Sequence, residues 1–196
     1  RHMHRVGGKP AAGQGATGSF PISDWPRLPP QRGYAICADG GLSVARTASL
    51  WRARGVGPGD RVAIKLPDGP DWVVAFLGTI WCGAIAVGVN PRAPTADWQY
   101  ILDEAGFRLI LAETYDDTPA PWRERVLLSG DWRDALPGCV ALPAMPMDED
   151  APAIWCHSSG TSGKPKAVVH AHRFARQIEQ VSREGLGIVG ESGSGK

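Results

Sequence analysis

GDRVAIKLPDGPDWVVAFLGTIWCGAIAVGVN, residues 59–90, is the stretch that decides the fold. It begins with a short buried-strand run at 62–66, continues with large apolar residues at helical spacing over 71–82, and ends with a second strand run at 84–89. Gly83 is expected to end the helix. Two strands joined by a single helix predict a right-handed crossover between parallel strands.

The same alternation of helices and strands continues on both sides of this stretch. A helix is expected over 42–54, with Ser43 as its N-cap and Gly55 after its end, and another begins with Thr95 as its N-cap and is closed by Gly106. Further strands are expected at 109–112 and 126–128, and the proline-containing residues 137–152 are expected to form a surface connection. The predicted fold class is α/β, a parallel sheet flanked by helices.

One segment has a second interpretation. Residues 72–91 are uncharged over a length that could span a membrane. Gly78, Gly83, Gly88 and Asn90 within the stretch favour a helix followed by a strand instead.

The composition excludes binding that is driven by bulk charge. Lysine and arginine number 21 and aspartate and glutamate 20, so the net charge is +1 and we expect no nucleic-acid partner and no attraction to an anionic membrane surface. Because of the glycines within residues 72–91, we also expect no membrane insertion. The four cysteines form no CxxC pair and follow no secretory signal, which predicts a reduced, cytoplasmic setting. A zinc site built from Cys156, His157, His170 and His172 is an alternative, although their spacing matches no common ligand pattern.

The segment that carries chemistry follows a predicted strand at 153–156 and has the sequence HSSGTSGKPK, residues 157–166. Glycines let backbone N–H groups approach a ligand, hydroxyls donate hydrogen bonds to oxygens and lysines balance negative charge, so this loop is suited to a polyphosphate. The spacing and Pro165 are wrong for a Walker A loop, and the residues that follow are strand-like rather than helical. An ordinary hairpin loop rich in serine and glycine is the alternative.

SSGTSGKPK followed by AVVHAH resembles the phosphate-binding signature of the adenylate-forming superfamily, which includes acyl- and aryl-CoA synthetases, luciferases and peptide-synthetase adenylation domains. Residues 55–113 are similar to the first subdomain of that family, and the resemblance extends over about residues 42–186. It implies that residues 34–186 are a partial AMP-binding synthetase/ligase N-terminal domain. Residues 1–33 are then expected to be a disordered arm rich in glycine and proline, and residues 187–196 a Gly/Ser-rich tail.

The resemblance also implies roles for residues of the loop and nearby. The residues that would wrap the β- and γ-phosphates of ATP are Ser158, Ser159, Gly160, Thr161, Ser162 and Gly163. Thr161 would lie near a magnesium ion, and Lys164 and Lys166 would add positive charge. His172 falls where many relatives have a histidine, whereas His157 stands where many have tyrosine, which leaves open whether His157 is a buried histidine bonded to backbone or a ligand contact.

The implied reaction has two steps. A carboxylic acid attacks the α-phosphate of MgATP to give an acyl-adenylate and pyrophosphate, and a thiol such as coenzyme A then displaces AMP. The family's adenine-binding motif, its catalytic lysine and the CoA site are expected outside these residues, so we expect no catalytic residue here and no activity from the chain alone. A preference for aryl acids rests on KPKAVVHAHR alone.

A rival motif ends the chain. Residues 190–196, GESGSGK, have the GxxxxGK spacing of a Walker A loop and resemble that of ABC-type transporter ATPases. The Ser/Thr and the helix that complete such a site would follow Lys196. A fragment of an ABC-transporter P-loop ATPase and a non-catalytic α/β nucleotide-binding module are therefore the alternative functions.

Overall fold

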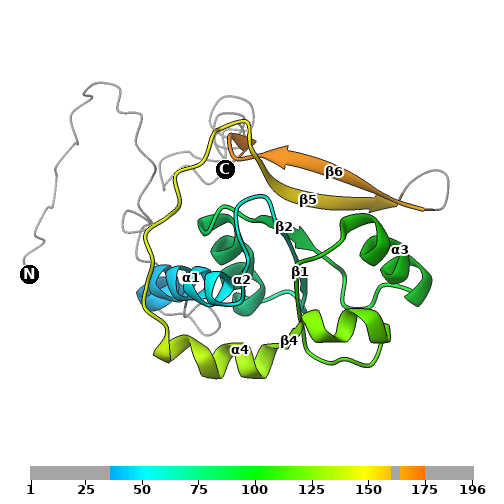
Figure 1. The fold of residues 1–196 in the computed structure, drawn as a ribbon, viewed down its shortest axis with the longest axis horizontal. Helices are drawn as coiled ribbons and strands as arrows, with labels where there is room; N and C mark the ends of the chain where they lie inside the picture. The colour runs from blue at the N-terminus through cyan, green and yellow to red at the C-terminus, as the bar shows by residue number, and fades with distance from the viewer. Residues whose placement is uncertain (1–35, 160–163, 175–196) are drawn as a thin grey trace, which may run out of the picture.

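The computed structural model describes residues 36–159 and 164–174. Its elements are α1 (Ile36–Ala53), β1 (Arg61–Lys65), α2 (Pro70–Trp81), β2 (Ile85–Gly88), α3 (Thr95–Ala105), β3 (Leu109–Ala112), η2 (Ala120–Arg125), β4 (Val126–Leu128), α4 (Ser129–Ala135), η3 (Leu136–Gly138), β5 (Pro152–Ser159) and β6 (Pro165–Ala171). The strands form one sheet in the order β4-β3-β1-β2-β5-β6 (Figure 1). β1 to β5 pair in parallel and β6 pairs antiparallel to β5, which confirms the α/β class and the helix-flanked sheet.

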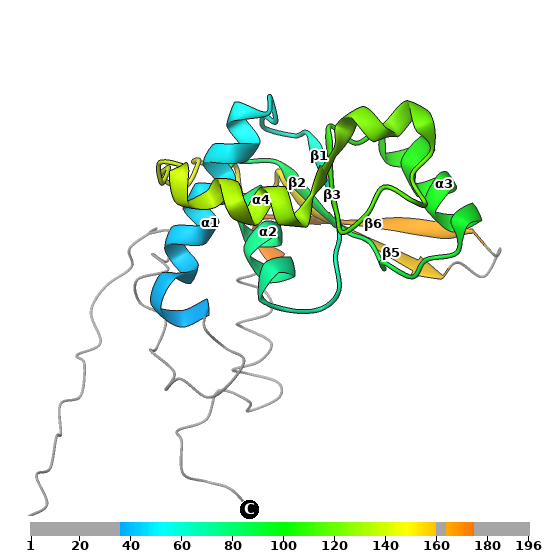
Figure 2. The same ribbon diagram turned by 90° about the horizontal axis from the view of Figure 1, so that it is seen from below.

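The sheet lies between two apolar cores, one on each face. Alternate residues of β1 point to opposite faces, so Ile64 packs in the core formed with α1, α2 and α4, while Ala63 packs in the core formed with α3. Figure 2 shows α3 separated from α1, α2 and α4. Trp51 on α1 and Trp98 on α3 are completely buried, as expected for the apolar faces of these helices.

The stretch that could have spanned a membrane is divided among α2, a turn at Gly83 and β2. Gly83 has φ 80°, a conformation that favours glycine, and the Gly83 N–H donates to the Ile80 carbonyl at 3.0 Å. No helix in the part of the chain that the structure describes is long and apolar enough to cross a membrane.

Two predicted helix caps are wrong. α1 begins at Ile36, so Ser43 lies inside the helix, because glycines 40 and 41 lower helix propensity without stopping the helix. Thr95 is the first residue of α3, and Pro94 stands at the N-cap with its carbonyl accepting from the Trp98 N–H at 3.0 Å. The predicted end of α3 is confirmed, because Gly106 has φ 58° and ψ 51°.

The elements from α1 to η3, residues 36–138, are here called the body of the molecule. Residues 139–151 connect the body to β5 and have no regular structure. This connection passes beside α1 and α2 (Figure 1), where the Leu142 N–H donates to the Ala45 carbonyl at 3.3 Å and the Trp81 indole donates to the Leu142 carbonyl at 2.8 Å. The expected surface connection is confirmed. The expected arm at 1–33, the tail at 187–196 and the GxxxxGK motif lie outside the described residues.

Candidate functional site

The loop singled out from the sequence joins the two strands of a hairpin. β5 ends at Ser159 and β6 begins at Pro165, so the prediction that the loop joins strand to strand is confirmed. Ser158 pairs with Lys166 in the antiparallel register. Ser158, Lys164 and Lys166 are exposed at this end of the hairpin.

The remaining predicted phosphate-binding residues are only partly described. Ser159 is the last residue of β5, whereas Gly160, Thr161, Ser162 and Gly163 lie outside the described residues. The roles predicted for these residues, including magnesium binding by Thr161, therefore stay predictions.

A cavity of about 730 Å³ lies next to the hairpin. Its lining comes from the β1–α2 turn and the first turn of α2, from the end of β2 and the turn after it, from the residue after β3, and from β5. The lining residues are Leu66, Pro67, Asp68, Trp72, Gly88, Val89, Asn90, Pro91, Arg92, Glu113, Cys156 and His157. The cavity thus opens at the carboxyl ends of parallel strands, where open α/β sheets bind ligands.

The topology explains why the cavity forms there. The chain leaves β1 toward β2 on one side of β1, then crosses to β3 on the other side. The connection after β1 leads to α2 on one face of the sheet, and the connection after β2 leads to α3 on the other face. The segments after these two strands therefore diverge and line a crevice at their carboxyl ends.

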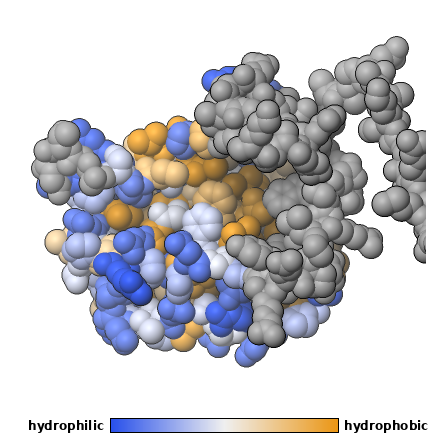
Figure 3. Space-filling view, turned by 180° about the vertical axis from the view of Figure 1, so that it is seen from behind, coloured by the Kyte–Doolittle hydropathy of each residue, from blue (hydrophilic) through white to orange (hydrophobic). Residues whose placement is uncertain are grey.

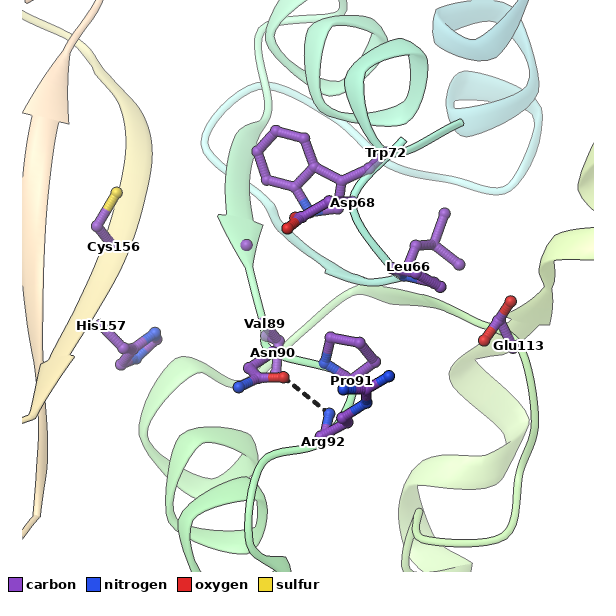
Figure 4. Close-up of a pocket in the computed structure, with 12 residues that line it drawn as sticks. Leu66, Asp68, Trp72, Val89, Asn90, Pro91, Arg92, Glu113, Cys156 and His157 are labelled. Carbon is purple, nitrogen blue, oxygen red and sulfur yellow. Dashed lines mark hydrogen bonds between the residues drawn. The ribbon is translucent and has the colours of Figure 1, made fainter. Parts of the chain in front are cut away.

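The cavity combines apolar and polar walls (Figure 4). Trp72 and Leu66 supply apolar surface, while Asn90, Arg92 and His157 supply polar groups. The Asn90 side-chain oxygen accepts from the Arg92 backbone N–H at 2.9 Å, which fixes the turn after β2. Such a mixture suits a ligand that has both a flat or apolar part and hydrogen-bonding groups.

His157 lies on β5 with its ring directed toward Asn90 (Figure 4). Its side chain is 8% exposed, and its Nε2 lies 3.6 Å from Glu104 Oε2. Within the described residues, neither ring nitrogen has a hydrogen-bond partner. Burial lowers the pKa of His157, and the nearby Glu104 carboxylate opposes that shift. Of the two alternatives for His157, a histidine bonded to backbone is therefore wrong, and the side chain faces the cavity.

His172 follows β6 and is half-buried, and burial lowers its pKa. The four residues of the alternative zinc site are not gathered together, because residues 36–159 and 164–174 contain no group of three or more histidine, cysteine, aspartate or glutamate side chains that could hold a metal ion.

A buried lysine holds the segments behind the cavity. Lys65, the last residue of β1, donates to the Pro91 carbonyl at 3.2 Å and forms an ion pair with Asp117. Its Nζ also lies 5.7 Å from the centre of the Trp98 ring. Lys65 therefore fixes the turn after β2, which lines the cavity, to the loop after β3 and to α3.

The cavity residues Asp68, Arg92 and Glu113 were not predicted from the sequence. Each follows a correctly predicted parallel strand within a few residues, and that position was the available signal. Their convergence depends on the strand order, which the separate motifs do not specify.

Comparison with known proteins identifies the family. Residues 40–186 match the family described as AMP-binding enzyme. The chain belongs to this family. The resemblance to the adenylate-forming superfamily noted in the sequence is confirmed.

Two characterised relatives illustrate the family's range. The 3-hydroxybenzoate–CoA/4-hydroxybenzoate–CoA ligase of Thauera aromatica is 34% identical over 160 residues, which are 73% of this chain and 31% of the relative. The sulfoacetate–CoA ligase of Cupriavidus necator is 31% identical over 182 residues, 83% of this chain and 35% of the relative. The chain spans about a third of the length of these relatives.

A solved structure supports the same assignment. The N-terminal subdomain of Klebsiella oxytoca NpsA, in complex with 3-hydroxybenzoyl-AMSN, superimposes with a TM-score of 0.57 at 29% identity and covers 68% of this chain and 33% of that one.

Proposed function

We propose that this chain is the N-terminal, phosphate-binding part of an ATP-dependent acid–thiol ligase of the acyl- or aryl-CoA synthetase type. The observation that carries the proposal is the β5–β6 hairpin, which sets Ser158 opposite Lys166 beside a cavity at the carboxyl ends of the parallel strands. Family membership and the loop signature support it.

The proposed reaction joins a carboxylate and ATP and then transfers the acyl group. The carboxylate oxygen attacks the α-phosphorus and pyrophosphate leaves, and a thiol, for which we propose coenzyme A, then attacks the acyl carbon and AMP leaves. Both reactants of the first step are anions, so positive charge and fixed donors are needed to bring them together. Exposed Lys164 and Lys166 and the Ser158 hydroxyl are suited to hold the phosphates. A magnesium ion would accompany the ATP, with Thr161 as its proposed ligand.

For the acid we propose an aromatic carboxylate. The Thauera aromatica relative is named for hydroxybenzoates, and the Klebsiella oxytoca structure holds a 3-hydroxybenzoyl compound. The sulfoacetate relative is slightly less similar in sequence. For the location we propose the cytoplasm, since the cysteines at 82, 139 and 156 are free thiols.

The test is isotope exchange between pyrophosphate and ATP in a chimera, in which residues 40–186 replace the matching segment of the Thauera aromatica ligase. We expect exchange that depends on hydroxybenzoate. Lys166→Ala combined with Thr161→Ala removes a cation and a hydroxyl from the loop, and we expect it to lower exchange at least tenfold, as for the loss of a fixed electrostatic donor.

A matched control removes the same kinds of group elsewhere. Arg54→Ala with Ser43→Ala deletes an exposed cation just after α1 and a half-buried hydroxyl on α1, away from the hairpin, and is expected to leave exchange unchanged. Full exchange in the loop variant would contradict the assignment of the phosphate site. The 196-residue chain alone should bind MgATP weakly, so submicromolar affinity would show that the expected need for further segments is wrong.

A further inference from the structure

One helix contacts both ends of the β5–β6 connection. Tyr100 and Glu104 lie four residues apart on α3 and therefore share one face of the helix. Glu104 approaches His157, the residue before Ser158, and the Tyr100 ring lies under Lys164, the residue before β6. Figures 1 and 2 both place α3 beside this end of the hairpin.

The contact on the β5 side joins the Glu104 carboxylate to an imidazole that is charged only when it is protonated. The distance of 3.6 Å between His157 Nε2 and Glu104 Oε2 exceeds ordinary hydrogen-bonding length. The Glu104 side chain is 34% exposed while that of His157 is 8% exposed, so the carboxylate reaches from the protein surface toward a buried ring. Glu104 thus lies against the residue that precedes Ser158.

The contact on the β6 side involves a cation and an aromatic ring. Lys164 Nζ lies 5.4 Å from the centre of the Tyr100 ring, within the range of a cation–π interaction. Lys164 is exposed, and a free lysine side chain samples many rotamers. The ring therefore restricts where the ammonium group lies.

We propose that Tyr100 and Glu104 are positioning residues that hold Lys164 and the Ser158 end of β5 in place for a phosphate anion. The inference rests on the proposed function. Neither residue needs to touch the anion, since each acts through its neighbour on the hairpin. Holding both ends in advance reduces the conformational entropy that is lost when an anion binds.

The probe is pyrophosphate, titrated into the 196-residue chain at constant ionic strength and followed by NMR through the amide signals of Ser158 and Lys166. Tyr100→Leu removes the ring and is expected to weaken binding about threefold, in line with an exposed cation–π contact. Tyr100→Phe keeps the ring without the hydroxyl and is expected to retain the affinity of the original chain.

Glu104→Gln separates positioning from simple charge effects. Removing a negative charge near an anion site would by itself strengthen pyrophosphate binding. If Glu104 acts by holding His157, the same change weakens binding instead. The ring signals of His157 report the contact directly: Glu104→Gln lowers the pKa of His157 further, while Tyr100→Leu leaves it unchanged.

The outcomes distinguish the two proposals. If pyrophosphate shifts the amide signals of neither Ser158 nor Lys166 in the original chain, the proposed phosphate site is wrong, and so is the inference that rests on it. If pyrophosphate binds at the hairpin, but the Tyr100→Leu and Tyr100→Phe variants bind it equally well, only the positioning role is overturned. The same holds if the Glu104→Gln variant binds it more tightly than the original chain. Unchanged Trp98 indole signals in every variant verify that the fold is intact.

Discussion

The parallel part of the sheet and the β5–β6 hairpin differ in how much of their side chains they bury. Residues 62–65 of β1 and all four residues of β3 are buried, with helices on both faces. β6, by contrast, is an edge strand on which Val168 and Val169 remain 44% and 49% exposed. Figure 3, a view from behind, shows apolar residues (orange) gathered in the upper and central part of the molecule.

The parallel strands thus stabilise the fold, while the hairpin carries the polar groups proposed to bind phosphate. The buried strands supply the free energy of folding, because burial of apolar surface dominates that free energy. The hairpin contributes little burial on its outer strand, yet it carries the hydroxyls and lysines. We therefore expect substitutions in the body to change stability and substitutions in the hairpin to change anion binding.

The largest expected effect is on the body. Trp51→Ala removes a completely buried ring whose indole N–H donates to Thr79 Oγ1 at 2.9 Å, and should lower the free energy of unfolding by about 3–5 kcal/mol. Val168→Ala in the hairpin should cost about 0.5 kcal/mol or less, because that side chain is already exposed. Urea unfolding followed by circular dichroism measures both, and equal losses would contradict the proposed division.

The next effect tests the ion pair behind the cavity. Asp117→Asn leaves the buried Lys65 ammonium without its carboxylate and should cost about 1.5–3 kcal/mol, the usual value for a hydrogen bond to a charged group. The control is Asp71→Asn, which breaks an exposed pair with Arg133 and should cost about 0.5 kcal/mol. If Asp71→Asn lowered the free energy of unfolding as much as Asp117→Asn does, the buried Lys65 pair would be no more stabilising than an exposed one.

A close helix contact comes third. A Cβ atom added at Gly78 on α2 would lie 2.6 Å from the Thr47 side chain on α1, where both residues are buried. Gly78→Ala should therefore destabilise the chain by about 1–3 kcal/mol through overpacking. Gly130→Ala, where nothing lies within 4 Å, is the matched control. Similar melting temperatures for the two variants would mean that α1 and α2 are less closely packed than described.

The smallest effect concerns pH and the hairpin. The folded pKa of His157 lies below its usual 6.5, so the unfolded chain takes up the proton first as pH falls. Above pH 6.5, His157 does not change the free energy of unfolding. Between pH 6.5 and its folded pKa, it lowers the free energy of unfolding progressively as the pH falls. His172 has the same sign. His157→Gln should flatten the decline in the urea midpoint as the pH falls below 6.5, and an unchanged slope would contradict the burial of His157.

Local sequence patterns predicted most of the body and only part of the site. Continuous apolar runs located β1 and β2, and helical spacing located α2 and α3, to within about a residue, because both faces of these strands and one face of each helix are buried. The predicted caps Ser43 and Thr95 are wrong because α1 continues through the glycines at 40 and 41 and the Pro94 carbonyl begins α3. The contact between Glu104 and His157 joins residues 53 positions apart and depends on strand order, so no local pattern indicates it.

The most direct test of the central claim is a map of pyrophosphate binding over the amide signals of the whole 196-residue chain. The account predicts that the largest shifts fall at Ser158, Lys164 and Lys166, with smaller shifts at His157 and along α3. Shifts concentrated at Gly195 and Lys196 would favour the Walker A alternative, and no shifts at the hairpin would contradict the claim that it is the phosphate-binding part of the chain.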